Sequence, residues 1–147
     1  MWLVKVESDM ACAVSMLAQT LPSPTIQDIK EPNKCIRQWK QRSDRYLEIT
    51  GFPDDEMIFL ASTDSAWANC RYGHSQAGYF IGATVRDMAT GAECKLSPLV
   101  WESAKLTRVC PSTLAAESMA MTKCMAETTF LQVMWHEMGD GIFDLHA

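Results

Sequence analysis

Hydrophobic and polar positions follow two different periods along this 147-residue chain, and the period changes near residue 50. In the first part, apolar side chains recur every three to four residues, which predicts a helix over 2–20 and a second helix that opens at Thr25. The segment "LPSPT" separates the two, because its prolines cannot continue a helix. Thr25 and Asp28 have the spacing of a capping box. Pro32 either kinks the second helix or marks its true start.

The second part has the period of strands and then of one long helix. Three apolar or alternating runs predict strands over 57–63, 75–87 and 92–103. The segment "DMATG" predicts the turn between the last two strands. A helix is then expected over 112–138, ended by Gly139 and Gly141. We expect it to pack on the sheet through one apolar stripe: Leu114, Met121, Met125, Leu131, Met134 and Met138.

This order of elements predicts an α/β fold, in which a long helix covers a three-stranded antiparallel sheet and two helices precede that sheet. The change of period divides the chain into a helical segment, 1–50, and an α/β segment, 51–147. A chain of 147 residues can hold one medium-sized domain, or one domain with a fragment of another.

Composition excludes two classes of protein. Every apolar run is too short to span a bilayer, and charged residues interrupt the N-terminal segment, so we expect neither a membrane protein nor a signal peptide. The six cysteines form no close pairs and have no zinc-ligand spacing with the three histidines. Reduced thiols are typical of intracellular proteins, and we expect a cytoplasmic or nuclear location.

Charge is unevenly distributed. The net charge of −5 argues against a general nucleic-acid binder. One segment is nevertheless basic, with Lys34 and Arg37 near its centre. A local basic stripe can contact phosphates even on an acidic protein. A solvated helix face is the alternative explanation of this segment. Its basic residues are Lys30, Lys34, Arg37, Lys40, Arg42 and Arg45.

Two carboxylates are the candidate chemistry of this chain. Asp64 continues the strand face begun by Ile58 and Leu60, where a buried, unpaired acid would cost several kcal/mol. It is therefore solvated in a turn, paired, or bound to a cation. Glu117 lies one turn into the long helix, where Ala116 allows a close approach to the sheet. We expect the two acids to converge, and such a pair suits a divalent hard cation such as Mg²⁺ or Mn²⁺.

Four motifs, in order, resemble the ribonuclease H region of copia-type LTR-retrotransposon Pol polyproteins. They are "TDSAWAN", "SQAGYFIG", "VWESAKLTRV" and "STLAAESMAM". The preceding "MWLVKVESDMACAVSMLAQTLPSPT" looks like the end of a reverse transcriptase, and "KCIRQWKQRSDRYLEI" resembles the connecting helix that follows it. The resemblance covers essentially the whole chain. Each motif alone is weakly specific, whereas four in the right order are fairly specific.

The resemblance implies a function. Asp64 corresponds to the first metal-binding aspartate of the family and Glu117 to its helix glutamate. Such enzymes cleave the RNA strand of an RNA–DNA hybrid with two Mg²⁺ (or Mn²⁺) ions. The implied partners are the hybrid and the remainder of the reverse transcriptase and polyprotein. Ser75, Gln76 and two basic residues after the third strand, Lys105 and Arg108, are candidate hybrid contacts; a polar turn and a solvated loop are the alternatives.

The chain also departs from the family pattern. Family members have two further acids, one after a fourth strand and one near a C-terminal helix, and this sequence ends at Ala147 before either. Asp140 and Asp144 follow the long helix too closely to replace them. We therefore expect a truncated ribonuclease H-like domain or a decayed copy, nearly inactive by itself. The alternative is a catalytically dead remnant that serves as a nucleic-acid-binding or interaction module.

Overall fold

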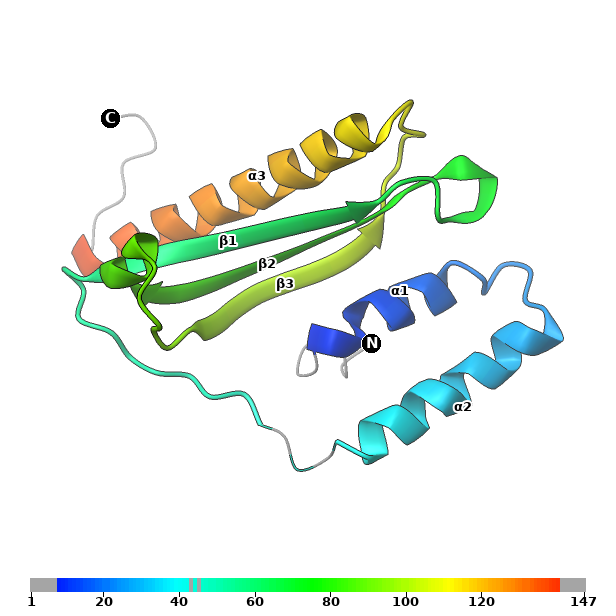
Figure 1. Ribbon diagram of the computed structural model, residues 1–147, viewed down its shortest axis with the longest axis horizontal. Helices are drawn as coiled ribbons and strands as arrows, with labels where there is room; N and C mark the ends of the chain where they lie inside the picture. Colours follow the sequence, from blue (N-terminus) through cyan, green and yellow to red (C-terminus); the bar gives the residue numbers. More distant parts are fainter. Residues whose placement is uncertain (1–7, 43, 45, 141–147) are drawn as a thin grey trace.

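A three-stranded antiparallel sheet with helices on both faces forms the centre of the molecule (Figure 1). The computed structural model describes residues 8–42, 44 and 46–140. The strands are β1 (Met57–Ala66), β2 (Gln76–Val85) and β3 (Ser97–Lys105), in the order β1-β2-β3. The helices are α1 (Ala11–Ala18), α2 (Ile26–Lys40) and α3 (Thr113–Asp140). The short 3₁₀ turns are η2 (Ser8–Met10), η3 (Arg71–Gly73) and η4 (Arg86–Thr90).

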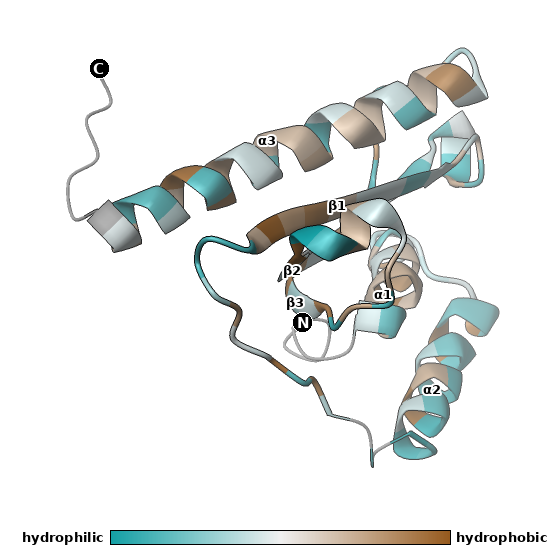
Figure 2. Ribbon diagram, turned by 60° about the vertical axis from the view of Figure 1, so that its left-hand side comes forward, coloured by the Kyte–Doolittle hydropathy of each residue, from teal (hydrophilic) through white to brown (hydrophobic). Residues whose placement is uncertain are grey.

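The long helix covers the sheet as predicted, and α1 adds a layer on the other face that was not predicted. Helix α3 lies over β1 and β2 on one face of the sheet, and α1 packs against β3 on the opposite face. Helix α2 lies outside α1, so that α2 and α3 are on opposite sides of the sheet (Figures 1 and 2). The predicted α/β fold, with its three-stranded antiparallel sheet and long C-terminal helix, is confirmed.

The N-terminal helices differ from prediction in their bounds. The first helix was expected over 2–20, but α1 spans only Ala11–Ala18, and residues 1–7 lie outside the described part of the chain. The capping box is confirmed. The Thr25 amide donates to the Asp28 carboxylate (2.8 Å), and the Asp28 amide donates to Thr25 Oγ1 (3.3 Å). Since the helix starts at Ile26 and continues through Pro32, this proline does not mark the helix start.

Strand bounds also shift. β1 runs on to Ala66 and includes Asp64, so this acid lies within the strand and not in a turn after it. β3 begins at Ser97, later than the predicted residue 92. The predicted turn between the last two strands begins as η4 and is closed by Gly91, whose φ of 90° is a left-handed conformation that suits glycine.

A β-bulge interrupts the pairing of β2 with β3. Ile81 pairs with Val100 and Gly82 with Pro98, so Leu99 is the extra residue. Among the described strands β3 is at an edge of the sheet, the position at which proline is tolerated. The two strands approach closely here: a Cβ on Gly82 would lie 2.8 Å from the Ser97 carbonyl oxygen. A larger residue than glycine would therefore clash with the backbone of β3 at position 82.

Helix α3 packs on the sheet through small residues and not through the predicted apolar stripe. Its buried positions are Ala116, Ala120 and Cys124, spaced by four residues. They pack in two clusters with side chains of the sheet and of the chain after β3: Ala77, Leu106 and Cys110 in one, Phe59, Tyr79, Ile81 and Val100 in the other. Small side chains bring the helix axis close to the strands, which leaves the larger residues outside.

The predicted stripe was therefore wrong for most of its length. Leu131 packs against the core, but the other residues of the stripe are exposed, with Leu114 at 74% and Met138 at 75%. The predicted helix end was also wrong, because Gly139 is still helical; Gly141 lies outside the described residues. The exposed members of the stripe are Leu114, Met121, Met125, Met134 and Met138.

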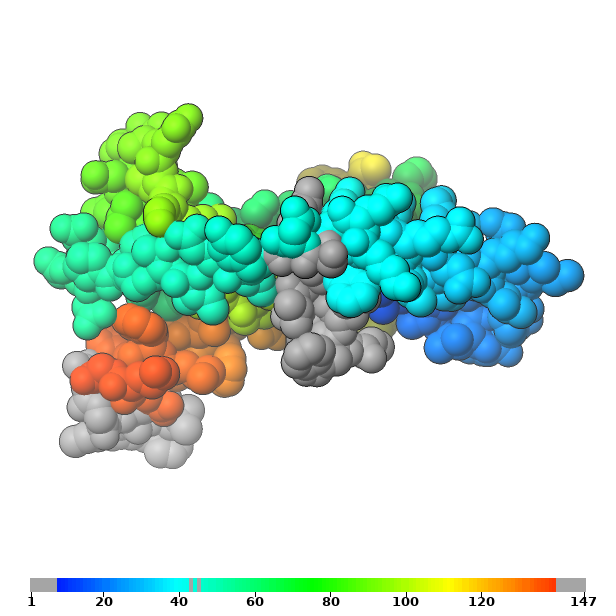
Figure 3. Space-filling view, turned by 90° about the horizontal axis from the view of Figure 1, so that it is seen from below, coloured from blue at the N-terminus to red at the C-terminus, as the bar shows by residue number. Residues whose placement is uncertain are grey.

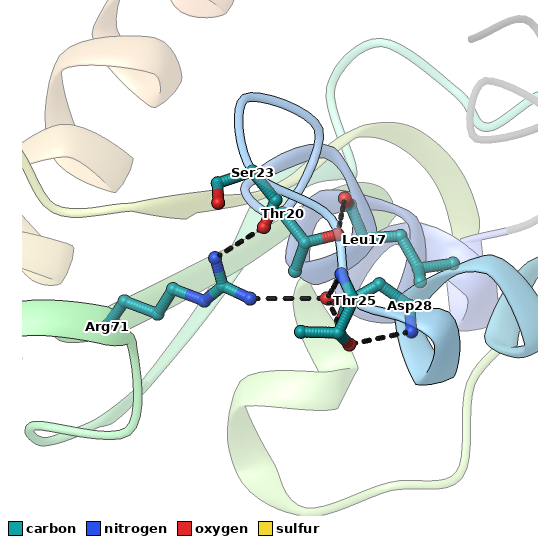
Figure 4. A network of polar contacts seen from close by, with 6 residues as sticks. All are labelled: Leu17, Thr20, Ser23, Thr25, Asp28 and Arg71. Atoms are coloured by element: carbon teal, nitrogen blue, oxygen red, sulfur yellow. Dashed lines mark hydrogen bonds and ion pairs between the residues drawn. The ribbon is translucent and has the colours of Figure 1, made fainter.

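Helix α2 is attached by its N-terminal end. Arg71, in η3, donates to the Ser23 carbonyl and forms an ion pair with Asp28 (both 3.2 Å; Figure 4). The hydrogen bonds from Thr25, and then the charge of Arg71, lower the pKa of the Asp28 carboxyl. No residue of α2 is buried. Ile29, Ile36 and Trp39 were expected to form an apolar stripe that needs a partner, and Ile29 and Ile36 are indeed exposed.

Two further expectations concern the whole chain. No helix within the described residues has the length and hydropathy to cross a membrane. All six cysteines lie in the described part and none forms a disulfide. The proposed division at residue 50 stays a prediction.

Candidate active site at one end of the sheet

The ends of three strands and the start of one helix meet at one end of the sheet. They are the C-terminal ends of β1 and β3, the N-terminal end of β2 and the first turns of α3 (Figure 1). The amide of Leu106, just after β3, donates to the Ser75 carbonyl (2.8 Å). Trp67, just after β1, donates its indole N–H to the Cys110 carbonyl (2.9 Å), which fixes the loop before α3. Asp64 and Glu117 therefore belong to elements that converge.

Asp64 is exposed and lies opposite Gly78 in the β1–β2 pair. Its Oδ1 accepts a hydrogen bond from the Ser65 amide (2.8 Å). Because its neighbour across the ladder has no side chain, the carboxylate faces open space. It lines a cavity of about 360 Å³, together with Asp9 and Asn69. Solvation explains why the strand can carry this acid beyond its apolar half.

Strand alternation decides which face Asp64 occupies. Ser65 pairs with Ala77, which packs beneath α3, so Asp64 and Gly78 face the opposite side, where α1 lies. Glu117 belongs to α3 and follows Ala116, which is fully buried. The two acids thus belong to opposite sides of the sheet.

The flank of α3 that carries Glu117 can nevertheless be assigned. Met119 and Lys123 line a cavity of about 260 Å³ with Lys105 and Leu106, so this flank of the helix faces β3. Glu117 lies about 200° from Met119 around the helix, hence on the flank above β1. Among the described strands β1 has β2 as its one neighbour. Glu117 and Asp64 therefore flank the outer edge of β1 from its two sides.

Few side chains at this end of the sheet could bind the metal that the resemblance implies. Within the described residues no group of three or more His, Cys, Asp or Glu side chains is arranged to hold a metal ion. Asp64 and Glu117 remain the candidate pair, and their convergence on one ion stays a prediction. Asp144 lies outside the described residues.

Ser75 and Gln76 do not fit the expected role of nucleic-acid contacts. Both are buried, at 0% and 4% exposure. The Gln76 amide nitrogen donates to Ser15 and Ser103 (2.9 and 2.8 Å), and its oxygen accepts from Gln19 (2.9 Å). This network joins α1 to the sheet. A side chain that is enclosed and fully hydrogen-bonded within the protein cannot reach a phosphate, so this expectation is corrected.

The basic candidates form two separate groups. Lys105, the last residue of β3, and Arg108, on the chain after it, are exposed at the same end of the sheet as Asp64. Lys34 and Arg37 are exposed on α2, and Lys34 lies 3.7 Å from Glu31 in an ion pair. The first group shares an end of the sheet with the candidate carboxylates but lies at β3, two strands from β1, whereas the second belongs to a helix that contacts α1.

A polar cluster that sequence reasoning missed lies next to the same end. The Tyr79 hydroxyl donates to Glu102 (3.0 Å), which also forms an ion pair with Lys123 on α3 (2.6 Å). The Lys123 ammonium lies 5.8 Å from the centre of the Tyr79 ring. Burial, and then the bond to Glu102, raise the pKa of the Tyr79 phenol. Because these residues are far apart in sequence, only the β2–β3 register could have revealed them.

Comparison with known proteins adds no relative. No protein-family model matches the chain, and neither curated proteins nor solved structures gave a significant match.

Proposed function

We propose that this chain is a ribonuclease H-like part of a retrotransposon polyprotein, preceded by the end of its reverse transcriptase, and that Asp64 and Glu117 are active-site carboxylates. One observation carries the proposal. The acid within β1 and the acid in the first turns of α3 come to the same end of the sheet and flank the edge of one strand. Four sequence motifs in family order support the same assignment.

The donor set suits a hard divalent cation that keeps most of its water. Mg²⁺ is commonly held by one or two carboxylates and completes its coordination with water and substrate phosphate oxygens. Asp64 is exposed and Glu117 is half-buried, so oxygens of both carboxylates can face solvent. When bound there, Mg²⁺ or Mn²⁺ would activate a water molecule and offset charge on the scissile phosphate. Asp64 and Glu117 would position the ion and leave its other coordination positions to water and phosphate oxygens.

An RNA–DNA hybrid is the proposed substrate class. Lys105 and Arg108 extend from the same end of the sheet and would contact phosphates without reading sequence. Lys34 and Arg37 would contribute only if the hybrid also reached α2. The remainder of the polyprotein is the proposed partner of the helical segment.

Cleavage by this chain alone is not expected. Two divalent ions at the short separation of two-metal catalysis repel each other strongly, and two carboxylates offset only part of that charge. The pair should hold one ion weakly. The second candidate function is a remnant that binds nucleic acid or another protein without cleaving.

A metal titration combined with a cleavage assay tests the proposal. The purified chain is titrated with Mn²⁺ by calorimetry and incubated with a labelled RNA–DNA hybrid. Asp64→Asn and Glu117→Gln should each abolish binding, whereas Asp54→Asn, which alters an exposed acid before β1, should not. Binding that survives both site variants would refute the site.

The cleavage arm has its own outcomes. We expect no cleavage above background. Robust cleavage by the unmodified chain that is lost in Asp64→Asn would confirm the nuclease assignment and refute the charge argument, because further acids would then complete the site.

A further inference from the structure

The loop between β1 and β2 holds one aromatic side chain out in the solvent. Tyr72, in η3, is 91% exposed, more than any other large hydrophobic side chain that the structure describes. Its φ of 61° is a left-handed conformation, which costs free energy for a residue with a Cβ and is rare for a bulky one. Glycine or asparagine would be favoured there. Neither backbone conformation nor packing therefore explains a tyrosine at this position.

Hydrogen bonds fix the loop around Tyr72. The Cys70 amide donates to the His74 carbonyl across the turn (2.9 Å). The Asn69 side-chain oxygen accepts from the Gln76 amide (2.9 Å), which ties the loop to the start of β2. The aromatic ring is thus presented from an ordered turn, so a ligand that binds it does not have to order the loop first.

The chain that follows β3 lies beside this loop. His74 donates from Nδ1 to the Leu106 carbonyl (2.9 Å), since a carbonyl oxygen can only accept. A Cβ on Gly73 would lie 3.9 Å from Val109 Cγ1. The two segments therefore form one continuous surface. It also carries Val109 (58% exposed) and Trp67 (47%), whose indole ring is held by the hydrogen bond described above.

This loop surface, residues 67–75 and 105–110, is positive on an acidic protein. The chain has 18 acidic residues and a net charge of −5, yet neither segment contains an aspartate or a glutamate. The two segments contain Arg71, Lys105 and Arg108. Arg71 is engaged with the start of α2, whereas Lys105 and Arg108 are exposed after β2 and α1 have been covered. The loop surface thus combines exposed rings with cations, which fits a ligand that is both anionic and aromatic.

We propose that the loop surface binds a single-stranded stretch of nucleic acid, with one unpaired base stacked on the Tyr72 ring and neighbouring phosphates at Lys105 and Arg108. Proteins bind single strands through aromatic rings beside cations, because every base offers a π-face and every linkage a charge. Bases inside a duplex are already stacked on each other and offer no free face. For its class of ligand the inference rests on the proposed function, and it adds the form that is bound and the residues that bind it.

Fluorescence anisotropy of labelled oligothymidine and oligouridine, each of about 12 nucleotides, tests this proposal. The solution contains a chelator, so that no ion at the carboxylate pair contributes. The unmodified chain should bind at least one of the two single strands more tightly than a duplex of the same length. Tyr72→Asn should raise the dissociation constant at least about fivefold. Tyr72→Phe keeps the ring and should change the constant by less than about twofold.

Stability separates a lost contact from a misfolded loop. Because asparagine tolerates the left-handed conformation better than tyrosine, Tyr72→Asn should unfold at the same or a higher urea concentration. Tyr46→Asn is the matched control, since Tyr46 is 84% exposed and its loss should leave binding unchanged. The segment 46–56 that carries it extends away from the start of α2, the point to which Arg71 joins the loop (Figure 3).

Salt dependence tests the phosphate contacts. The logarithm of the binding constant should fall linearly with the logarithm of salt concentration between about 50 and 200 mM. Arg108→Gln should reduce the size of that slope by about 0.7, the value for one phosphate contact on a single strand. An unchanged slope would overturn the assignment of Arg108.

Three results would overturn the proposal as a whole. Tyr72→Asn might bind as tightly as the unmodified chain, in which case no base stacks on the ring. Tighter binding of the duplex would mean that the surface contacts only the backbone. A chain that binds neither single strand at up to about 1 mM has no such site, and the exposed ring would then contact another protein. None of these results touches the proposed carboxylate pair, which the Mn²⁺ titration tests by itself.

Discussion

Gly82→Ala tests the packing of β2 against β3 at the bulge. The added Cβ would lie 2.7 Å from Leu96 Cδ1 and 2.8 Å from the Ser97 carbonyl oxygen. The leucine side chain can rotate away, but the carbonyl belongs to the backbone of β3 and can move only with the strand. Overpacking of this kind costs about 1–3 kcal/mol. Alanine recovers about 0.5–1 kcal/mol of backbone entropy relative to glycine. The free energy of unfolding should therefore fall by about 1–2 kcal/mol.

Gly78→Ala is the matched control in the same strand. Its added Cβ would lie 3.4 Å from the Glu102 carbonyl oxygen, which is close to ordinary contact. This variant should be neutral or more stable by up to about 1 kcal/mol. Urea unfolding followed by far-ultraviolet circular dichroism gives both free energies. If the two variants were equally stable, the close approach at the bulge would be refuted.

Three further predictions concern the polar cluster, the helix cap and the face of α3. Tyr79→Phe removes the hydrogen bond to Glu102 and should lower the free energy of unfolding by about 1 kcal/mol. The folded pKa of Tyr79 is raised, so the unmodified protein should lose stability as pH rises above about 10 and the variant should not, which unfolding curves at alkaline pH would show. The lowered pKa of Asp28 means that its contribution to the α2 cap is present above its ordinary pKa and lost as pH falls through the folded value; helicity should therefore decline in acid, and Asp28→Asn should show less of this decline. Ala120→Leu should lower the free energy of unfolding by about 1–3 kcal/mol, whereas Met121→Ala should change it by no more than about 0.5 kcal/mol. If urea unfolding gave the reverse order, Met121 and not Ala120 would lie on the buried face of α3.

Local signals in the sequence predicted the fold well. Alternation of apolar residues gave the three strands, and Thr25 with Asp28 gave the start of α2, because both depend on residues a few positions apart. The strand ends were less certain. β3 starts at Ser97 and not at the predicted residue 92, because no local pattern shows where a strand begins to pair with its neighbour.

The buried face of α3 could not be predicted by ranking side chains by hydrophobicity. Methionine and leucine outrank alanine on any such scale, so Met121 and Leu114 were expected inside. The sheet beneath the helix instead favours a close approach, and Ala116 and Ala120 allow it. Packing distance depends on both partners, and one periodic pattern describes only one of them.

The candidate site shows the same limit. The two acids were recognisable because each follows a local signal, a strand end or a helix start. Gln76 looked like a surface turn residue, but its partners Ser15 and Ser103 come from elements far along the chain. Only the docking of α1 on the sheet buries it.

Paramagnetic broadening by Mn²⁺ tests most directly whether Asp64 and Glu117 share one ion. In an NMR titration, one bound Mn²⁺ should broaden the amide signals of Ser65 and of Ser118 together and at the same low concentration. The exposed acids at 54–56, at the other end of the sheet, should respond only at higher concentration. In Asp64→Asn the signal of Ser118 should then persist as well. If Ser65 and Ser118 broadened at different concentrations, or if 54–56 broadened first, the two carboxylates would not form one metal site.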